Sequence, residues 1–321
     1  MATADQLKAL IRSHFESDEV QFSTIALQLA AHEARQGHAA VANDIRLLID
    51  RSKVKQFKVI PLHRDLDDLI LSSEPSARMS DIILAESNRK RLERILQEFR
   101  QKGKLQKHGM ENRRKLLLAG PPGTGKTLTA SVLAGELALP LFIVLMDKLV
   151  TKFMGETGAK LRQIFNTIRE RPGIYLFDEF DAIGAERARD NDVGEMRRVL
   201  NAFLQLIETD GSESIIIAAS NSPKILDQAL FRRFDDVLHY QLPGLPEIKQ
   251  LVGNRLGSFK GPKFPLESIS SKAVALSHAE ITQACDDAIK VAILDDRKQV
   301  SGNLLNLMLD DRHSAYARDD Q

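Results

Sequence analysis

Short apolar runs alternate with helical segments between about residues 115 and 240. Such runs are typical of strands buried on both faces, whereas the segments between them repeat apolar residues every three to four positions, as amphipathic helices do. The predicted strands are residues 115–119, 141–145, 174–177, 215–219 and 237–240, and the helices among them include 126–139, 161–169 and 196–207. This alternation predicts an α/β fold in which a parallel sheet is covered by helices.

The segments on either side of this alternation have helical periods only. Apolar spacing predicts three short helices in residues 1–53, which are followed by a polar connector with Pro61 and Pro75. Helical spacing resumes at 82–100 and returns after residue 245, at 246–259, 272–275, 279–294 and 304–316. We therefore expect an N-terminal three-helix docking module (1–53), a linker (54–81), an α/β domain (82–244) and a small helical lid domain (245–321).

Composition and charge narrow the classes of partner. The chain has 45 basic and 44 acidic residues and a formal net charge of +1, so no strong field favours nucleic acid or an anionic membrane. Its single cysteine, Cys285, cannot form an internal disulfide, which is typical of a reducing compartment. No apolar run approaches the roughly 20 residues that span a bilayer. We therefore expect a cytoplasmic protein without a membrane partner.

A glycine-rich loop follows the first predicted strand of the α/β domain. The loop consists of Gly120, Pro121, Pro122, Gly123, Thr124, Gly125, Lys126 and Thr127, and a predicted helix follows it. Glycines let such a loop turn its backbone N–H groups inward, toward one anionic pocket at the positive end of the helix. Lys126 would reach the outer phosphates of a nucleotide, and the Thr127 hydroxyl would ligate Mg²⁺. The alternative is a surface turn rich in glycine and proline.

Two carboxylates follow the apolar strand at residues 174–177. In a parallel sheet this strand delivers Asp178 and Glu179 to the carboxyl edge, beside the glycine-rich loop. We expect Asp178 to hold Mg²⁺, directly or through water, and Glu179 to orient and polarise an attacking water. The alternative is an acidic loop after a buried strand.

With these motifs in order, residues 82–316 resemble the AAA+ ATPases and, among them, the AAA group proper. The resemblance implies ATP and Mg²⁺ as cofactors and places Leu128 next to the nucleotide. It also implies a polar sensor for the terminal phosphate at Asn221, which follows the strand 215–219. Arg232 and Arg233 stand where the family carries arginine fingers. The alternatives are a turn residue at Asn221 and an exposed pair of charges at the two arginines.

Two further segments resemble those of the family: residues 152–155 match its pattern, and residues 278–279 match it at one of two positions. Lys152, Phe153, Met154 and Gly155 match its pore loop, in which an exposed aromatic side chain grips polypeptide. The alternative is that Phe153 and Met154 are core residues of a short helix. In the lid the AAA group has a Gly-Ala pair, whereas this chain keeps Ala279 and has His278 in place of the glycine. That position implies a contact of His278 with the base or ribose.

The resemblance also implies an assembly and a class of work. A finger supplied in trans acts only between subunits, so we expect a homo-hexameric ring that threads a polypeptide substrate. The compact chain is similar to stand-alone bacterial AAA proteins encoded beside subtilisin-like serine proteases in conflict or defence systems, which implies such a protease as a partner. The alternatives are a nucleic-acid motor or transposition helper, and a nucleotide-gated switch without useful turnover.

Overall fold

The computed structural model describes residues 69–149, 154–181, 193–222 and 228–316, together with Ile25 and Leu29, which are both helical. The chain divides into two units, residues 1–61 and 62–321. The predicted N-terminal bundle lies outside the described residues apart from those two positions. The fold below is that of the second unit.

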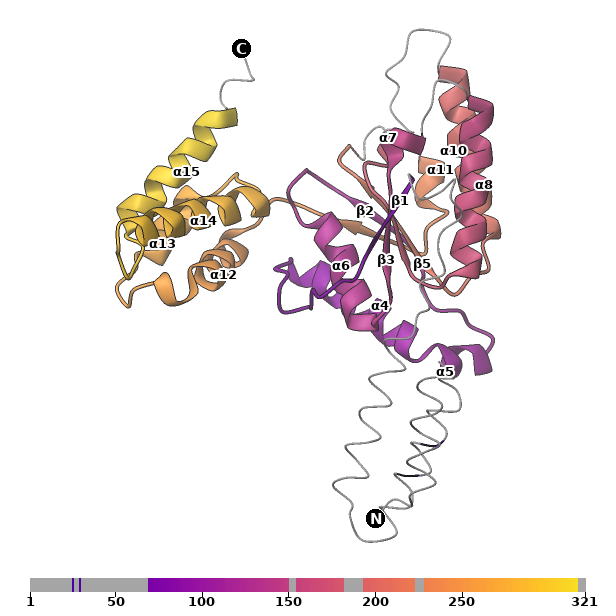
Figure 1. The fold of residues 1–321 in the computed structure, drawn as a ribbon, viewed down its shortest axis with the longest axis horizontal. Coiled ribbons are helices and arrows are strands. Elements are labelled where there is room, and N and C mark those ends of the chain that lie inside the picture. The colour runs from indigo at the N-terminus through magenta and orange to yellow at the C-terminus, as the bar shows by residue number, and fades with distance from the viewer. Residues whose placement is uncertain are drawn as a thin grey trace. The chain divides into compact units, whose positions relative to one another are not determined.

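A six-stranded sheet forms the centre of the α/β part (Figure 1). Its strands are β1 (Ile70–Ser73), β2 (Lys115–Ala119), β3 (Leu141–Val144), β4 (Ile174–Phe177), β5 (Ile215–Ser220) and β6 (Asp236–His239). They lie in the order β1-β3-β4-β5-β2-β6, and β2 to β6 pair in parallel. The predicted α/β fold is confirmed, and the carboxyl ends of the five parallel strands meet at one edge.

The edge strand β1 was not predicted. It lies within the segment expected to be a linker, and it pairs with β3 in the antiparallel direction, Ile70 opposite Val144. Its four residues do not alternate between buried and exposed, since Ile70 is buried and the next three are exposed. So short a segment carries too little period-two signal to be recognised, and only its pairing with β3 makes it a strand. The sheet is therefore mixed, and it begins before residue 82.

Both faces of the sheet are covered because neighbouring residues of each strand point to opposite sides. One face packs Leu117, Phe177 and Ile216 against α8 (Met154–Glu170) and α10 (Val193–Thr209). The other packs Leu116, Leu176 and Ile217 against α4 (Glu86–Arg100) and α6 (Lys126–Leu137). In Figure 1 these two helices lie on the opposite side of the sheet from α8 and α10. Burial on both sides explains why these strands are continuous apolar runs. The short helices α5 (Lys102–Lys107) and α7 (Met146–Leu149) follow α4 and β3.

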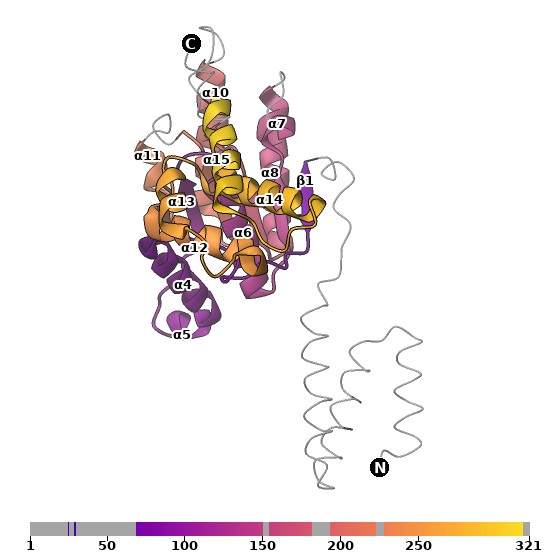
Figure 2. The same ribbon diagram turned by 90° about the vertical axis from the view of Figure 1, so that its left-hand side faces the viewer.

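Helices α12 (Leu245–Leu256), α13 (Leu266–Lys272), α14 (His278–Leu294) and α15 (Gly302–Tyr316) form a separate group (Figures 1 and 2). They share a core that includes Ile248, Ile269 and Leu305, and a 3₁₀ turn, Gly257–Phe259, extends α12. The prediction of a helix at 272–275 is wrong: α13 lies earlier in the chain and ends at Lys272, and Ala275 has a left-handed φ of 75°. The sequence of α13 is rich in serine, which is not typical of helices, and the hydroxyls of Ser270 and Ser271 donate to carbonyls one turn earlier.

No helix within the described residues is both long enough and apolar enough to cross a lipid bilayer.

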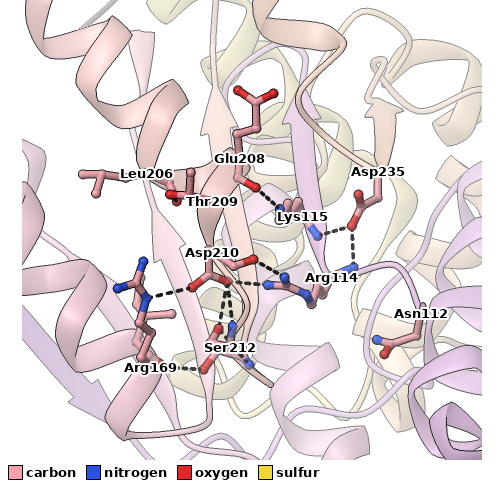
Figure 3. A network of polar contacts seen from close by, with 12 residues as sticks. Asn112, Arg114, Lys115, Arg169, Leu206, Glu208, Thr209, Asp210, Ser212 and Asp235 are labelled. Atoms are coloured by element: carbon pink, nitrogen blue, oxygen red, sulfur yellow. Dashed lines mark hydrogen bonds and ion pairs between the residues drawn. The ribbon is translucent and has the colours of Figure 1, made fainter. Parts of the chain in front are cut away.

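A buried ion pair joins the residue that precedes β2 to the residue that follows α10 (Figure 3). The guanidinium of Arg114 contacts the carboxylate and the carbonyl of Asp210, and both residues are buried. Ser212 donates its hydroxyl to the same carboxylate at 2.9 Å, and Nε of Arg169 lies 4.0 Å from its second oxygen. Because Arg114 is shielded from water, its positive charge is stabilised by the carboxylate of Asp210 and not by solvent.

We expect Asp210→Ala to lower the free energy of unfolding by about 3–5 kcal/mol, because it leaves the Arg114 charge buried without a counterion. The matched control is Asp310→Ala, which removes an exposed pair with Lys272 (2.6 Å) and should cost less than about 1 kcal/mol. Urea denaturation of both variants measures the difference. Equal, small losses would contradict the prediction.

Candidate nucleotide-binding site

The glycine-rich loop connects β2 to α6, as the sequence predicts. Gly120, Gly123 and Gly125 all have positive φ values, of 156°, 70° and 93°. A Cβ on Gly120 would lie 2.3 Å from the carbonyl oxygen of Tyr240, and one on Gly123 would lie 2.6 Å from Oγ of Ser277. These two positions therefore require glycine both for their backbone conformation and because Tyr240 and Ser277 of the same chain approach them closely.

Lys126 is the first residue of α6 and closes the loop. Its Nζ donates to the carbonyl oxygens of Gly120 (2.9 Å) and Pro121 (2.7 Å), so the ammonium lies inside the loop. Burial lowers the pKa of Lys126, and the carboxylates of Asp178 and Asp181 oppose that shift. The loop therefore holds a cation that is largely shielded from water, a favourable partner for phosphate oxygens.

The predicted magnesium ligands meet at the carboxyl edge of the sheet. The Thr127 hydroxyl donates to Oδ2 of Asp178 at 2.8 Å, although the two residues lie 51 positions apart in the chain. The other carboxylate oxygen of Asp178 accepts the backbone N–H of Glu179 at 2.9 Å. Hydroxyl and carboxylate oxygens are the ligands that Mg²⁺ prefers. The geometry of this pair fits a magnesium site.

Glu179 has an unusual backbone conformation. Its φ is 53°, in the left-handed region that a residue with a side chain rarely adopts, and the residue is exposed. Backbone strain of this kind costs about 1–3 kcal/mol and persists only where the surroundings hold it. Here the backbone N–H bonds on either side hold it: Glu179 donates to Asp178, and Phe180 donates to the carbonyl of Ala219 at 2.8 Å. The turn therefore directs Glu179 away from the buried strand.

Asn221 lies at the end of β5, next to the turn that carries the acidic pair. Its backbone N–H donates to Oδ1 of Asp181 at 3.1 Å, which ties β5 to the residues after β4. Asp181 is also one of the two carboxylates whose charge acts on Lys126. The ends of β4 and β5 are thus joined beside the loop, and Asn221 lines the same cavity as Glu179.

A cavity of about 920 Å³ gathers most of the predicted nucleotide site. The predicted residues that line it are Pro122, Gly123, Thr124, Gly125, Lys126, Thr127, Leu128, Asp178, Glu179, Asn221, His278 and Ala279. Gly120 and Pro121 lie below it and support Lys126 through their carbonyls. The cavity thus joins one loop, two strand ends and the lid.

The lid reaches the glycine-rich loop through the start of α14. Ser277 caps this helix reciprocally with Glu280, and the backbone N–H of Ala279 donates to the carbonyl of Gly123 at 3.0 Å. His278 lies between the large cavity and a second one of about 430 Å³, and it lines both. Both of its ring nitrogens are buried without a hydrogen-bond partner among the described residues, and burial lowers its pKa. A neutral imidazole with unused donor and acceptor capacity therefore borders the nucleotide cavity.

The candidate fingers, Arg232 and Arg233, follow the short helix α11 (Gln228–Phe231). Both are exposed, and neither lines the nucleotide cavity of its own chain. The guanidinium of Arg233 contacts the carboxylate of Glu208 on α10. The structure therefore separates these two arginines from the remaining predicted site residues.

The lid and the segment before α4 contribute residues that the sequence did not reveal. Ser80, Asp81, Ile82 and Ile83 line the cavity from the segment that was divided between linker and α/β domain. Leu251, Asn254, Arg255, Thr282 and Gln283 line it from α12 and α14. Arg255 on α12 pairs with Asp286 on α14 at 2.6 Å. Helical periodicity marks Asn254, Arg255, Thr282 and Gln283 only as polar positions, and the tertiary structure makes them part of the cavity wall.

The predicted pore loop lies largely outside the described residues. Lys152 and Phe153 are not described, whereas Met154 and Gly155 begin α8.

These features define the class of the protein as a P-loop nucleotide-binding protein of the α/β type. Comparison with known proteins supplies the family. Residues 116–242 match the model of the ATPase family associated with various cellular activities (AAA). The chain is also 33% identical over 330 residues to the uncharacterized AAA family ATPase y4kL of Sinorhizobium fredii, which covers 99% of this chain and 98% of that protein. The chain belongs to the AAA family of ATPases.

Two other relatives share only part of their length with this chain. The ATP-dependent zinc metalloprotease FtsH of Parabacteroides distasonis is 37% identical over 193 residues, 57% of this chain and 28% of that protein. The proteasome-activating nucleotidase of Methanothermobacter thermautotrophicus is 35% identical over 207 residues, 61% of this chain and 50% of that protein. The chain thus spans half or less of either relative.

Proposed function

We propose that the protein is an Mg-ATP-dependent, ring-forming ATPase that remodels or unfolds protein substrates by threading them through a central pore. The observation that carries the ATPase part is the meeting of Thr127 and Asp178 at 2.8 Å beside the loop that encloses Lys126. Glu179 and Asn221 line the same cavity. The groups that we propose as phosphate cradle, metal ligands and water-orienting residues thus lie at one edge of the sheet.

Each side chain has a distinct role in hydrolysis. The Lys126 ammonium would exchange its carbonyl contacts for oxygens of the terminal phosphates, while Thr127 and Asp178 would hold Mg²⁺. The metal, when bound, neutralises charge on the phosphate oxygens. The Glu179 carboxylate would orient and polarise the attacking water, and the Asn221 amide would contact the terminal phosphate and that water. His278 and Ala279 would border the base or ribose.

The placement of Arg232 and Arg233 supports an assembly. Both guanidiniums are exposed and lie outside the cavity of their own chain, so they are available to the cavity of a second copy. An arginine supplied in trans stabilises charge on the transferred phosphoryl group. Head-to-tail contacts that each place a finger in the next site close into a ring, and we propose a homo-hexamer.

The names of the relatives support a protein substrate. One is an ATP-dependent metalloprotease and another activates a proteasome, so both names link a nucleotide-hydrolysing module to proteolysis. We propose that this chain likewise acts on polypeptide, in the cytoplasm, and that a separate protease, of the subtilisin-like serine class, completes its work in a bacterial defence system. The near-neutral charge supports a protein substrate over nucleic acid.

The competing function is a nucleic-acid motor or a transposition or plasmid-maintenance helper. It predicts binding to DNA that weakens steeply as salt concentration rises, because phosphate contacts release counterions. Fluorescence anisotropy with labelled single- and double-stranded DNA at two salt concentrations distinguishes the two functions. Salt-sensitive binding that stimulates ATP hydrolysis would favour the nucleic-acid motor.

We expect Phe153→Ala to spare ATP hydrolysis but to abolish work on polypeptide. An alanine offers little apolar surface to grip a substrate, whereas the nucleotide cavity keeps all its groups. ATPase rate, thermal melting and ATP-dependent retention of unfolded casein are measured on the same preparation.

The matched control is Phe142→Ala, because Phe142 is buried in β3 and stacks on Tyr175 with ring centroids 4.7 Å apart. That change should lower stability by about 3–5 kcal/mol. If Phe153→Ala instead lowers melting temperature and ATPase rate together, as Phe142→Ala does, Phe153 is a core residue and the pore-loop prediction is wrong.

A further inference from the structure

The segment that carries the candidate fingers is anchored on both sides. Leu230 at the end of α11 is fully buried, and Phe234 has only 7% of its surface exposed. The backbone N–H of Arg233 donates to the carbonyl of Leu230 at 3.0 Å, which closes a turn between the two apolar anchors. Arg232 and Arg233 therefore project from a short turn. The contacts that hold this turn fix the backbone position from which the two side chains extend.

Asp235, two residues after Arg233, attaches this turn to the start of β2. Its Oδ2 accepts the backbone N–H groups of Arg114 and Lys115, each at 2.9 Å (Figure 3). Its own N–H donates to the carbonyl of Lys115 at 2.8 Å. We call these three hydrogen bonds the Asp235 clasp. A carboxylate that accepts from two amides makes charge-assisted bonds, which are stronger than neutral ones.

The clasp ends on a rigid part of the molecule. Lys115 begins β2, a strand with parallel partners on both sides, and β2 carries the glycine-rich loop at its other end. Arg114 is held by the buried pair with Asp210, as Figure 3 shows. Asp235 thus connects the finger turn to the strand that supports the chain's own phosphate loop.

Among the described residues, the side chain of Arg233 is held less firmly than this backbone. Its contact with Glu208 is an exposed ion pair, with side-chain exposures of 40% and 56%, and such pairs contribute little. A long arginine side chain that must meet phosphate oxygens on another subunit gains its accuracy from its backbone, because displacement by about 1 Å can cost about 10²-fold in rate. The backbone on the β6 side is fixed by the clasp.

We infer that Asp235 is a positioning residue for the fingers: it acts on the active site of the neighbouring subunit by holding the turn of Arg232 and Arg233 against β2. The inference rests on the proposed trans action of those arginines. Asp235 does not line the nucleotide cavity of its own chain. Its effect should therefore fall on turnover and spare ATP binding.

Asp235→Ala should lower turnover about 10²-fold while the affinity for a fluorescent ATP analogue stays at the wild-type value. Asp235→Asn keeps an oxygen that can accept both amides, so it should retain most of the turnover. The matched control is Asp236→Ala, because Asp236 bonds Val237 and the side chains of Arg91 and Arg113 but makes no clasp. That variant should hydrolyse ATP as the wild type does.

Mixed assemblies identify the subunit on which Asp235 acts. Asp235→Ala subunits keep an intact nucleotide cavity, and Lys126→Ala subunits keep an intact clasp and fingers. Mixing the two inactive proteins should restore turnover well above the sum of the separate samples, because each active cavity then receives a well-placed finger. No recovery, with co-assembly shown by native mass spectrometry, would overturn the inference, since a defect within the chain's own cavity cannot be rescued by a neighbour.

The outcome for Arg233→Ala separates this inference from the proposed function. If Arg233→Ala hydrolyses ATP normally, the fingers themselves are misassigned; if it is inactive while Asp235→Ala is normal, only the clasp fails. Should Asp235→Ala not remain folded by near-ultraviolet circular dichroism, Asp235→Glu replaces it, because the extra methylene moves the carboxylate relative to the two amides while retaining its charge. The same loss and rescue are expected of it, and wild-type turnover would overturn the inference.

Discussion

Glu179→Gln should leave ATP binding nearly unchanged while the rate of hydrolysis falls by about 10²–10⁴-fold. The glutamine keeps the size of the side chain but cannot accept a proton from the attacking water. It also leaves the backbone N–H that bonds Asp178 in place, so the metal ligands should not move. Binding of a fluorescent ATP analogue and release of phosphate in a single turnover measure the two effects separately.

The comparison with Lys126→Ala makes this prediction specific. Lys126 is the one cationic side chain of the glycine-rich loop, and its ammonium lies between the carbonyls of Gly120 and Pro121. Removing it should abolish ATP binding itself, because the loop loses the charge that neutralises the phosphates. Two variants that both bind ATP and hydrolyse it near the wild-type rate would show that the site is misassigned.

Arg233→Ala should reduce turnover by about 10³–10⁵-fold, the effect of removing an arginine finger, and Arg232→Ala should reduce it as well. Neither change should affect ATP binding by a single subunit, because both arginines lie outside the cavity of their own chain. Steady-state hydrolysis at saturating ATP and equilibrium binding under dilute conditions give the two quantities. A loss of binding as large as the loss of turnover would contradict a role in trans.

Complementation tests whether the site is shared. Arg233→Ala subunits have intact loops, and Lys126→Ala subunits have intact fingers. A mixed ring therefore contains a competent site wherever a Lys126→Ala subunit supplies its finger to the cavity of an adjacent Arg233→Ala subunit. Activity should therefore return when two inactive proteins are mixed. The matched control is a mixture of Lys126→Ala with Glu179→Gln, in which a defective nucleotide site stays in every subunit and no arrangement completes one.

Much of the α/β part could be predicted because its signals are local. The strands β2, β4 and β5 are apolar runs long enough to identify, since burial on both faces leaves no polar alternation. The glycine-rich loop is readable because Gly120 and Gly123 meet steric demands that no other residue meets. Asp178 and Glu179 could be placed because the end of a parallel strand fixes the sheet edge at which they emerge.

Other features depend on contacts between distant parts of the chain. β1 became a strand through its pairing with β3, and α13 became a helix through packing in the lid core rather than through its serine-rich sequence. The wall formed by Ile82, Leu251 and Arg255 exists because the lid meets the loop at Ala279 and Gly123. No periodicity along the chain reports such a meeting.

Consecutive residues are enough to predict nucleotide chemistry, because the glycine-rich loop and the pair of Asp178 and Glu179 are each contiguous in the chain and each has its own backbone requirements. The arrangement of those groups follows only from the tertiary structure: Thr127 meets Asp178, His278 borders the cavity with ring nitrogens that have no hydrogen-bond partner among the described residues, and Asp235 ties the turn of Arg232 and Arg233 to β2. Hydrogen bonds and packing contacts form between residues that are close in space. Because such residues can be far apart along the chain, the sequence pattern around each of them does not reveal the contact.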